Sequence, residues 1–188
     1  MTEIRWHGRG GQGAKTAAHL FAMAELKTGK YVQAFPEYGP ERSGSPVHAY
    51  DRVDDRPIRR HYGVREPHVV VVLDDTLLTE VDVARGLSPD GLLLVNTTLT
   101  DEVVATRTGY AGRIWCLPGD ALARSAGGHF ANVVLLGSLA RAVGPLPWEA
   151  VEDAVRELLG RRLAQAALER TLAAAWFGYA WTEGRAAR

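Results

Sequence analysis

The chain has 188 residues, 46% of them hydrophobic, and its 22 basic side chains are balanced by 22 acidic ones. This length and apolar content suit one domain with a sizeable core and argue against disorder. A net charge of zero argues against a general nucleic-acid or membrane-surface binder, which would carry a basic excess. One cysteine, Cys116, excludes an internal disulfide framework and an all-cysteine metal or cluster site on this chain.

We expect a single domain over residues 1–188, located in the cytoplasm, that binds neither nucleic acid nor a membrane. The first residues lead directly into a strand-like run and lack the apolar core of a signal peptide. The longest apolar run is far shorter than the ~20 residues that span a bilayer.

The first unit of the chain has the strand–turn–helix–strand order of a βαβ unit. Residues 3–7 predict a short strand, with Ile4 and Trp6 on one face. A glycine-rich turn follows, and the next apolar residues recur at helical spacing up to Gly29, which is placed as a C-cap. Residues 31–35 predict the second strand, which completes the unit.

Strands and helices follow along the rest of the chain, and the last third is helical and rich in alanine. Residues 68–73 form a run of valines without polar alternation, which is typical of a parallel strand buried on both faces. Other strands are predicted over residues 47–53, 57–60, 91–96 and 113–117. Helices are predicted over residues 120–125, 129–143, 147–159 and 161–179. These elements predict an α/β fold: a Rossmann-like, mostly parallel sheet with covering helices and a helical C-terminal third.

The glycine-rich turn after the first strand is the first candidate binding site. Gly8, Gly10 and Gly13 satisfy G-x-G-x-x-G between a strand and a helix, which is the context that this motif requires. Glycines permit positive φ angles and close backbone approach, and the unpaired N–H groups at a helix start suit a phosphate or another anion. The candidate cofactor-binding residues are Gly8, Arg9, Gly10, Gly11, Gln12, Gly13 and Lys15.

Other interpretations of this turn stay open. A dinucleotide site needs a ribose-binding acid at the end of the second strand, where the nearest carboxylate, Glu37, lies in a proline-rich segment. A P-loop needs a lysine directly after Gly13, but Ala14 intervenes before Lys15. In the plainest alternative, the glycines only permit a tight turn and close packing of the helix on the strand.

Residues 35–46 form a second unusual segment, with three prolines and two glycines in twelve residues. This composition excludes a regular helix or a central strand. The segment is either an ordinary surface loop or a stiffened docking loop, since proline limits the entropy that is lost on docking.

Together, the two segments resemble the gamma subunit, or gamma domain, of the 2-oxoacid:acceptor oxidoreductases, whose best-known member is pyruvate:ferredoxin oxidoreductase. The resemblance rests on residues 7–13 (HGRGGQG) and residues 35–44 (FPEYGPERSG). The end of the second motif is similar to the pyruvate, ketoisovalerate and phenylglyoxylate branches rather than to the 2-oxoglutarate branch. Residues 132–137 (NVVLLG) also resemble the family, so the resemblance spans nearly the whole chain.

The resemblance implies an accessory gamma subunit of a complex that converts a 2-oxoacid and coenzyme A to an acyl-CoA, CO2 and two electrons. Thiamine diphosphate, Mg and iron–sulfur clusters are then held by thiamine-binding and ferredoxin-like partner subunits. The residues agree: Gly119-Asp120-Ala121 departs from the usual Gly-Asp-Gly of a thiamine site, Asn132 follows too soon, and Cys116 is alone. The chain would hold no catalytic residue and no metal, and would help to form the coenzyme A site and the subunit interface.

With the resemblance, the proline-rich segment is interpreted as an interface loop near the active site. The candidate interface residues are Glu37, Tyr38, Glu41, Arg42 and Ser43. Two other hypotheses remain: a stand-alone NAD(P)-binding oxidoreductase with a Rossmann fold, and a pure assembly module that binds no small molecule.

Overall fold

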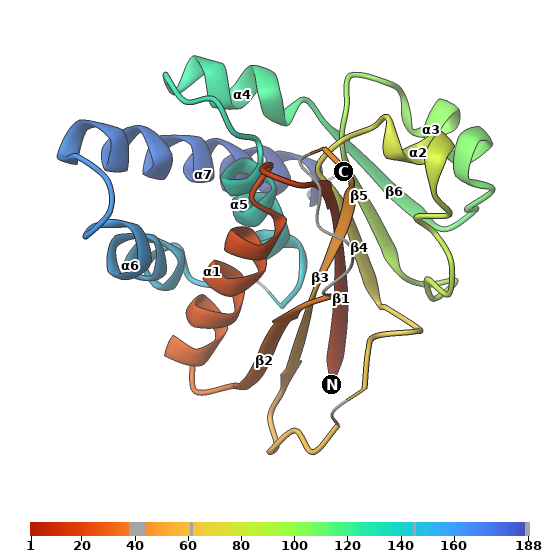
Figure 1. Cartoon of the computed structure of the whole chain (residues 1–188), viewed down its shortest axis with the longest axis horizontal. Coiled ribbons are helices and arrows are strands. Elements are labelled where there is room, and N and C mark those ends of the chain that lie inside the picture. The colour runs from red at the N-terminus through yellow and green to blue at the C-terminus, as the bar shows by residue number, and fades with distance from the viewer. Residues whose placement is uncertain (38–43, 61, 145, 187–188) are drawn as a thin grey trace.

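A computed structural model shows a six-stranded sheet with the strand order β2-β3-β1-β4-β5-β6 (Figure 1). The strands are β1 (Thr2–Arg9), β2 (Tyr31–Pro36), β3 (Pro46–Asp54), β4 (Val69–Val72), β5 (Leu92–Asn96) and β6 (Arg113–Leu117). The structure describes residues 1–37, 44–60, 62–144 and 146–186. The predicted α/β class is confirmed, whereas the strand predicted over residues 57–60 is wrong, because these residues belong to no strand.

Strand β3 makes the sheet mixed. It pairs antiparallel with β1, from Thr2↔Val53 to Arg9↔Pro46, and antiparallel with β2 on its other side. Strands β1, β4, β5 and β6 are parallel to one another. The predicted βαβ unit is therefore split: β1 and β2 run in the same direction, but β3 lies between them. Periodicity identifies a strand without showing which strand lies beside it, so this insertion was not predicted.

Helices cover the two faces of the sheet unequally (Figure 1). The larger layer holds α1 (Ala14–Lys27), α5 (Asn132–Ala142), α6 (Trp148–Leu159) and α7 (Gln165–Ala186), while the smaller holds α2 (Leu77–Glu80) and α3 (Asp101–Thr108). Helix α4 (Gly119–Ser125) contacts α5 and α7. In β4, Val69 and Val71 pack into the core cluster of the larger layer and Val70 and Val72 into that of the smaller, so the predicted burial on both faces is confirmed.

Helix α3 was not predicted, because its sequence carries no apolar stripe. Val104 is its buried residue, and most of the others are polar. Its end signals are nevertheless present: Thr100 accepts a hydrogen bond from the backbone of Val103 as the N-cap, and Gly109 has φ 66° at the C-cap. The observed bounds of the last helices also differ from the prediction, since α5 begins at Asn132 and α7 spans Gln165–Ala186. Among the described residues, no helix is long and apolar enough to cross a membrane.

The face of β1 and β3 turned away from α1 is polar yet buried. Glu3 and Arg52, which are opposite each other in the two strands, form an ion pair at 2.7 Å with exposed fractions of 8% and 0%. The Arg52 guanidinium also donates to the carbonyl oxygens of Arg60 and Tyr62. A loop therefore lies against Arg52 on this face, and two of its carbonyl groups bind the guanidinium.

Helices α5 and α7 cross at a contact made by two glycines. A Cβ on Gly137 would lie 1.9 Å from the carbonyl oxygen of Ala175, and a Cβ on Gly178 would lie 1.8 Å from that of Val134. Both distances are far below a van der Waals contact. The two backbones therefore approach so closely that any larger residue at either position must push the helices apart.

We expect Gly178→Ala to destabilise the fold by about 2 kcal/mol or more, because the added methyl group overlaps the carbonyl oxygen of Val134. Thermal unfolding followed by circular dichroism measures the change. Gly63→Ala is the matched control, since a Cβ at Gly63 meets no described atom within 4 Å. Equal losses of stability in the two variants would contradict the close crossing.

Two carboxyl groups lie buried where α1 packs on β3. Asp51 is fully buried, and its Oδ2 accepts a hydrogen bond from Trp6 Nε1 at 2.7 Å. Burial raises the pKa of Asp51 well above its usual range and raises the pKa of Glu25 on α1 to about 7. The folded chain therefore holds protons on both groups more tightly than the unfolded chain does.

We expect Glu25 to make the free energy of unfolding fall as the pH rises from about 4.5, the ordinary pKa of a glutamic acid, to about 7, where folded Glu25 ionises; buried His7, whose pKa is lowered, acts in the opposite direction in this range. The raised pKa sets this sign, because the proton is lost first from the unfolded chain. Glu25→Gln should flatten this decline, whereas Glu66→Gln, at an exposed position, should leave it unchanged. Urea titrations across this pH range test the prediction, and parallel slopes in both variants would refute it.

Candidate functional site

The glycine loop between β1 and α1 passes twice through left-handed backbone conformations. Gly11 has φ 96° and Gly13 has φ 80°, values that L side chains rarely adopt. A Cβ on Gly13 would also lie 2.5 Å from Nδ2 of Asn132, the first residue of α5. Gly13 therefore also permits close packing, here of the glycine loop against α5. The same turn places the first N–H groups of α1 at the carboxyl edge of the sheet.

The loop lies where the helices that follow neighbouring strands leave on opposite faces of the sheet. Helix α1 follows β1 on the larger-layer face, and α2 follows β4 on the other face (Figure 1). Strands β1 and β4 are parallel neighbours, so the segments after them, residues 9–13 and 74–76, flank an opening. In doubly wound α/β sheets, ligands bind at this topological switch point. The position of the predicted loop in the fold therefore makes it the candidate site.

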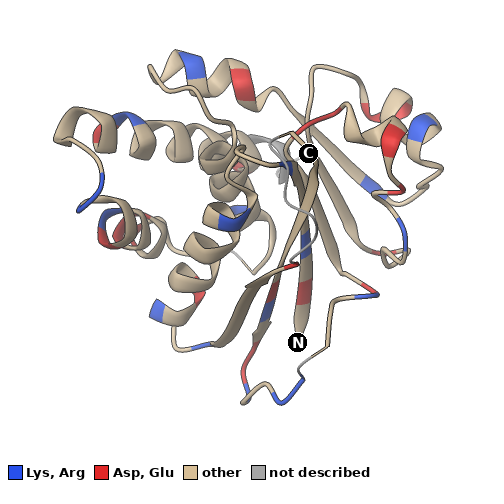
Figure 2. Ribbon diagram, in the orientation of Figure 1, with Lys and Arg blue, Asp and Glu red and all other residues tan. Residues whose placement is uncertain are grey.

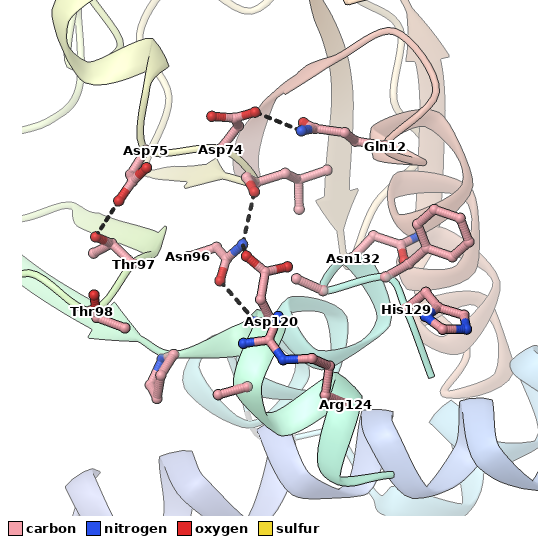
Figure 3. Close-up of a pocket in the computed structure, with 15 residues that line it drawn as sticks. Gln12, Asp74, Asp75, Asn96, Thr97, Thr98, Asp120, Arg124, His129 and Asn132 are labelled. Atoms are coloured by element: carbon pink, nitrogen blue, oxygen red, sulfur yellow. Dashed lines mark hydrogen bonds between the residues drawn. The ribbon is translucent and has the colours of Figure 1, made fainter. Parts of the chain in front are cut away.

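A polar network ties the glycine loop to the end of β4. Gln12 Oε1 accepts a hydrogen bond from the backbone N–H of Arg9 at 2.8 Å, and Gln12 Nε2 donates to Asp74 Oδ2 at 2.6 Å (Figure 3). Asp74 Oδ1 in turn accepts from the backbone N–H of Thr76 at 3.0 Å. Gln12 therefore holds the backbone of its own loop and fixes the distance of that loop from β4.

Arg9, one of the predicted anion-contacting residues, is held by acidic groups of the chain itself. Its Nε lies 3.2 Å from Asp74 Oδ2, and its Nη2 lies 2.6 Å from Glu80 Oε1 on α2. The hydrogen bond to Glu80 raises the pKa of Arg9. Burial alone would raise the pKa of Asp74, but hydrogen bonds from Thr76 and Gln12 outweigh it and lower that pKa. The charge of Arg9 is therefore balanced within the site.

A cavity of 480 Å³, the switch-point cavity, opens beside this network at the ends of β4, β5 and β6 (Figure 3). Asn96 joins these strand ends, because its Nδ2 donates to the carbonyl oxygen of Leu73 at 2.9 Å and to Asp120 Oδ2 at 3.0 Å. Asp75 Oδ2 accepts a hydrogen bond from Thr97 Oγ1 at 2.6 Å. The polar floor of the cavity is thus already ordered by hydrogen bonds within the chain.

Sequence reasoning did not select Asn96, Thr97 or Asp120 as site residues. Asn96 ends β5, Thr97 follows it, and Asp120 stands in the first turn after β6. The position of a polar residue directly after a buried parallel strand was the available signal. It becomes informative only when the strand order shows that these ends are neighbours.

A second cavity, of 520 Å³, lies on the other side of the glycine loop, towards β3, and we call it the loop cavity. Lys15 and Thr16 from the first turn of α1 line one part of it, and Glu37 and His48 line another. Lys15 is exposed. The loop cavity therefore combines the partial positive charge of a helix N-terminus with a lysine, an arrangement that suits an anion.

Glu37 is fixed in the wall of the loop cavity. Its backbone N–H donates to the carbonyl oxygen of His48 at 3.1 Å, and its Oε2 lies 3.0 Å from His48 Nδ1. The Tyr50 hydroxyl donates to the same carboxylate and lowers the pKa of Glu37 in opposition to burial. The other four predicted interface residues lie outside the described part of the chain; they are Tyr38, Glu41, Arg42 and Ser43.

His7 connects this wall to the central strand. Burial lowers the pKa of His7 to about 2, and the neighbouring His48 and Arg5 act in the same direction. Arg5 Nε donates to His7 Nε2 at 2.9 Å, and the rings of His7 and His48 meet edge to face with centroids 4.5 Å apart. His7 is therefore a neutral, buried link between β1 and the strand that carries the Glu37 wall.

The donor atoms of the described residues do not fit a metal cofactor. They contain no group of three or more His, Cys, Asp or Glu side chains that could hold a metal ion. Cys116 lies half-buried on β6. Within the described residues, the single cysteine cannot supply the ligands of an all-cysteine iron–sulfur cluster.

The fold and the site define a doubly wound α/β protein with a glycine loop at its switch point. The pyruvate ferredoxin/flavodoxin oxidoreductase family model matches residues 3–181, and the chain belongs to this family. The family predicted from the two sequence motifs is thereby confirmed.

Named relatives match over nearly their whole length. The chain is 44% identical to pyruvate synthase subunit PorC of Thermotoga maritima, covering 94% of this chain and 92% of the relative. It is 45% identical to the common subunit gamma of the pyruvate/ketoisovalerate oxidoreductases of Thermococcus kodakarensis, covering 90% of this chain and 95% of the relative.

Solved structures share the fold. The crystal structure of pyruvate oxidoreductase subunit PORC from Thermotoga maritima superposes with a TM-score of 0.84 at 41% identity and covers 95% of both chains. A 2-oxoglutarate:ferredoxin oxidoreductase from Magnetococcus marinus, with 2-oxoglutarate, coenzyme A and succinyl-CoA bound, has a TM-score of 0.76 at 16% identity. That match covers 97% of this chain and 31% of the other, and at this identity it shows the fold alone.

We expect Asp74→Ala to loosen the glycine loop, because it removes the acceptor of Gln12 and one of the two acids that hold Arg9. Hydrogen exchange of the amides of residues 9–13 should become about tenfold faster, which corresponds to one lost charge-assisted hydrogen bond. Asp153→Ala, at an exposed position on α6, is the control. Unchanged exchange in the loop of the Asp74 variant would show that the network does not hold it.

Proposed function

We propose that this chain is the gamma subunit of a 2-oxoacid:ferredoxin oxidoreductase complex, which converts a 2-oxoacid and coenzyme A to an acyl-CoA, CO2 and two electrons. The observation that carries the proposal is the match, along nearly the full length, to subunits named PorC and gamma. Their names favour pyruvate or ketoisovalerate as the 2-oxoacid. In this role, residues 1–188 act as one cytoplasmic, gamma-type domain that is not catalytic by itself.

We propose further that the redox and carbanion cofactors lie on thiamine-binding and ferredoxin-like partner chains. When bound there, thiamine diphosphate stabilises the carbanion and the iron–sulfur clusters carry the electrons away. In support, the described residues of this chain contain no group of three or more His, Cys, Asp or Glu side chains that could hold a metal ion. Its own contribution is therefore to bind, orient and shield a substrate that the partner chains transform.

The loop cavity is the part of this chain that we propose to contribute to the coenzyme A site. Coenzyme A carries three phosphate groups, and the cavity combines the α1 N-terminus with Lys15 beside the glycine loop. Coenzyme A is bound in the Magnetococcus marinus enzyme that shares this fold. Lys15, which stands in the first turn of α1 and lines the cavity, is the cation that we assign to a phosphate.

The topology argues against the alternative of a nicotinamide dinucleotide site. In that site, the ribose-binding acid stands at the end of the strand beside β1. Here β3 lies between β1 and β2, which moves the end of β2 one strand away. Glu37, the acid at that end, is also held by His48 and Tyr50. Binding of NAD(P) by the isolated chain in calorimetry would favour this alternative.

We expect Lys15→Ala to raise the KM for coenzyme A of the assembled complex about tenfold, since one charge-assisted contact to a phosphate is lost. The kcat at saturating coenzyme A should stay within about twofold of the parent value. Lys27→Ala, at the other end of α1 and paired with Glu157, is the matched control. If Lys15→Ala alters only the yield of complex and leaves this KM unchanged, the chain is a pure assembly module.

A further inference from the structure

A third cavity, of 310 Å³, lies between the glycine loop and α7. It shares Gly11, Gly13 and Thr16 with the loop cavity, so the two cavities border the same N-terminus of α1. Much of the remaining wall is apolar and comes from α5, α6, α7 and the loops beside them; these side chains are Phe130, Val133, Leu159, Leu163 and Ala174. A mainly apolar cavity with a few polar groups is typical of a small-molecule site.

Phe130 lies in the wall of the third cavity and is nevertheless 62% exposed. The backbone on both sides of it is anchored. Before it, the N–H of Gly128 donates to the carbonyl oxygen of Ala123 at 2.8 Å; after it, Asn132 Nδ2 donates to the carbonyl oxygen of Gly13 at 3.2 Å. An aromatic ring on a fixed backbone beside a cavity offers a flat ligand a face on which to stack.

Arg170 of α7 is the one Lys, Arg, Asp or Glu among the residues that line the third cavity. Its side chain lies against the loop that carries Phe130, because a Cβ on Gly127 would lie 2.8 Å from Arg170 Cδ. Within the described part of the chain, no acidic side chain pairs with Arg170, and the preceding Glu169 is bound by Arg156 at 3.1 Å. A guanidinium in this position is available to a phosphate.

The switch-point cavity also borders Phe130 but suits an anion less well. Asp74, Asp75 and Asp120 line it, against one guanidinium group, that of Arg124. Figure 2 shows these acidic positions in the segment after β4 and in α4. The third cavity has no carboxylate in its lining, so of the two cavities beside Phe130 it is the one that favours a negatively charged ligand.

We propose that the third cavity receives the adenosine part of coenzyme A, with the adenine ring stacked on Phe130 and the phosphate of its ribose bound by Arg170. In coenzyme A this ribose joins the adenine ring to the diphosphate. One ligand can therefore place its diphosphate at the α1 N-terminus and its ring in the cavity that borders the same turn. The inference rests on the proposed function, because it extends the proposed coenzyme A site beyond the loop cavity.

The first test uses the assembled complex and measures two constants: the KM for coenzyme A, and the Ki of adenosine 3′,5′-bisphosphate, which contains the adenosine part alone. Phe130→Ser should raise both about tenfold, since the stacking of a base on an aromatic ring is lost. Phe130→Tyr keeps a ring and should stay within about twofold of the parent. Leu26→Ser is the matched control, because Leu26 is 59% exposed at the far end of α1, and should change neither constant.

The second test compares coenzyme A with dephospho-coenzyme A, which lacks the phosphate of the ribose. In the parent complex the KM for dephospho-coenzyme A should be about tenfold higher, because one charge-assisted contact is missing. In Arg170→Ala this difference should vanish, since the residue and the phosphate then act as one lost pair. Arg107→Ala, at an exposed position on α3, is the control and should keep the difference.

The outcomes separate this inference from the proposed function. If the parent complex does not use coenzyme A, the proposed function fails and the adenosine subsite with it. If Lys15→Ala raises the KM for coenzyme A while Phe130→Ser and Arg170→Ala leave it unchanged, the proposed function stands and the subsite is overturned. If Phe130→Ser lowers only the yield of complex, Phe130 contacts a partner chain and the inference is equally overturned.

Discussion

The structure depends on the central position of β1, which is paired along its whole length with β3 on one side and from Ile4 to His7 with β4 on the other. The two faces of β1 have different surroundings. Ile4 and Trp6 pack in the apolar layer under α1, while Glu3 and Arg5 are buried among loops. A strand fixed on both edges and both faces cannot shift its end. The glycine loop therefore starts from a rigid point, and the hydrogen bonds of Gln12 can define its position relative to β4. Precision at the site follows from the burial of this strand, whose last residue, Arg9, lies in the site.

Local patterns predicted the parts of the fold that depend on local chemistry. The valine run of β4 indicates burial on both faces because no polar side chain interrupts it, and the glycines of the loop mark positive φ angles that other residues resist. The insertion of β3 and the assembly of Asn96 with Asp120 depend on contacts between distant segments, for which a single sequence holds no periodic signal. Helix α3 lies between these cases: its caps are local, but its stability comes from packing that its polar sequence does not reveal.

Near the glycine loop, charged side chains are paired with partners of opposite charge and do not gather into a patch of one sign. Arg9 is bound by Asp74 and Glu80, and Glu37 is bound by His48 and Tyr50, so acids and bases near the loop largely satisfy one another. Such pairs contribute little to stability where they are exposed, but they hold loops in one geometry. A neutral total charge is therefore compatible with the proposed anion site, because that proposal rests on one helix N-terminus and one lysine. The net charge of the chain argues against polyanion partners but does not describe the local charges of this site.

The glycine loop and α7 are structurally continuous although they are far apart in the sequence. Asn132, the first residue of α5, donates to the carbonyl oxygen of Gly13 at 3.2 Å, and α5 crosses α7 at Gly137 and Gly178. A cavity of 310 Å³ lies between them, lined by Gly11 and Gln12 on one side and by Thr171 and Ala174 of α7 on the other. Because the glycine crossing leaves no slack between α5 and α7, α7 is joined through α5 to the glycine loop. The loop, α5 and α7 therefore form one rigid layer, which suits the proposed role of a subunit that positions groups for chemistry on other chains.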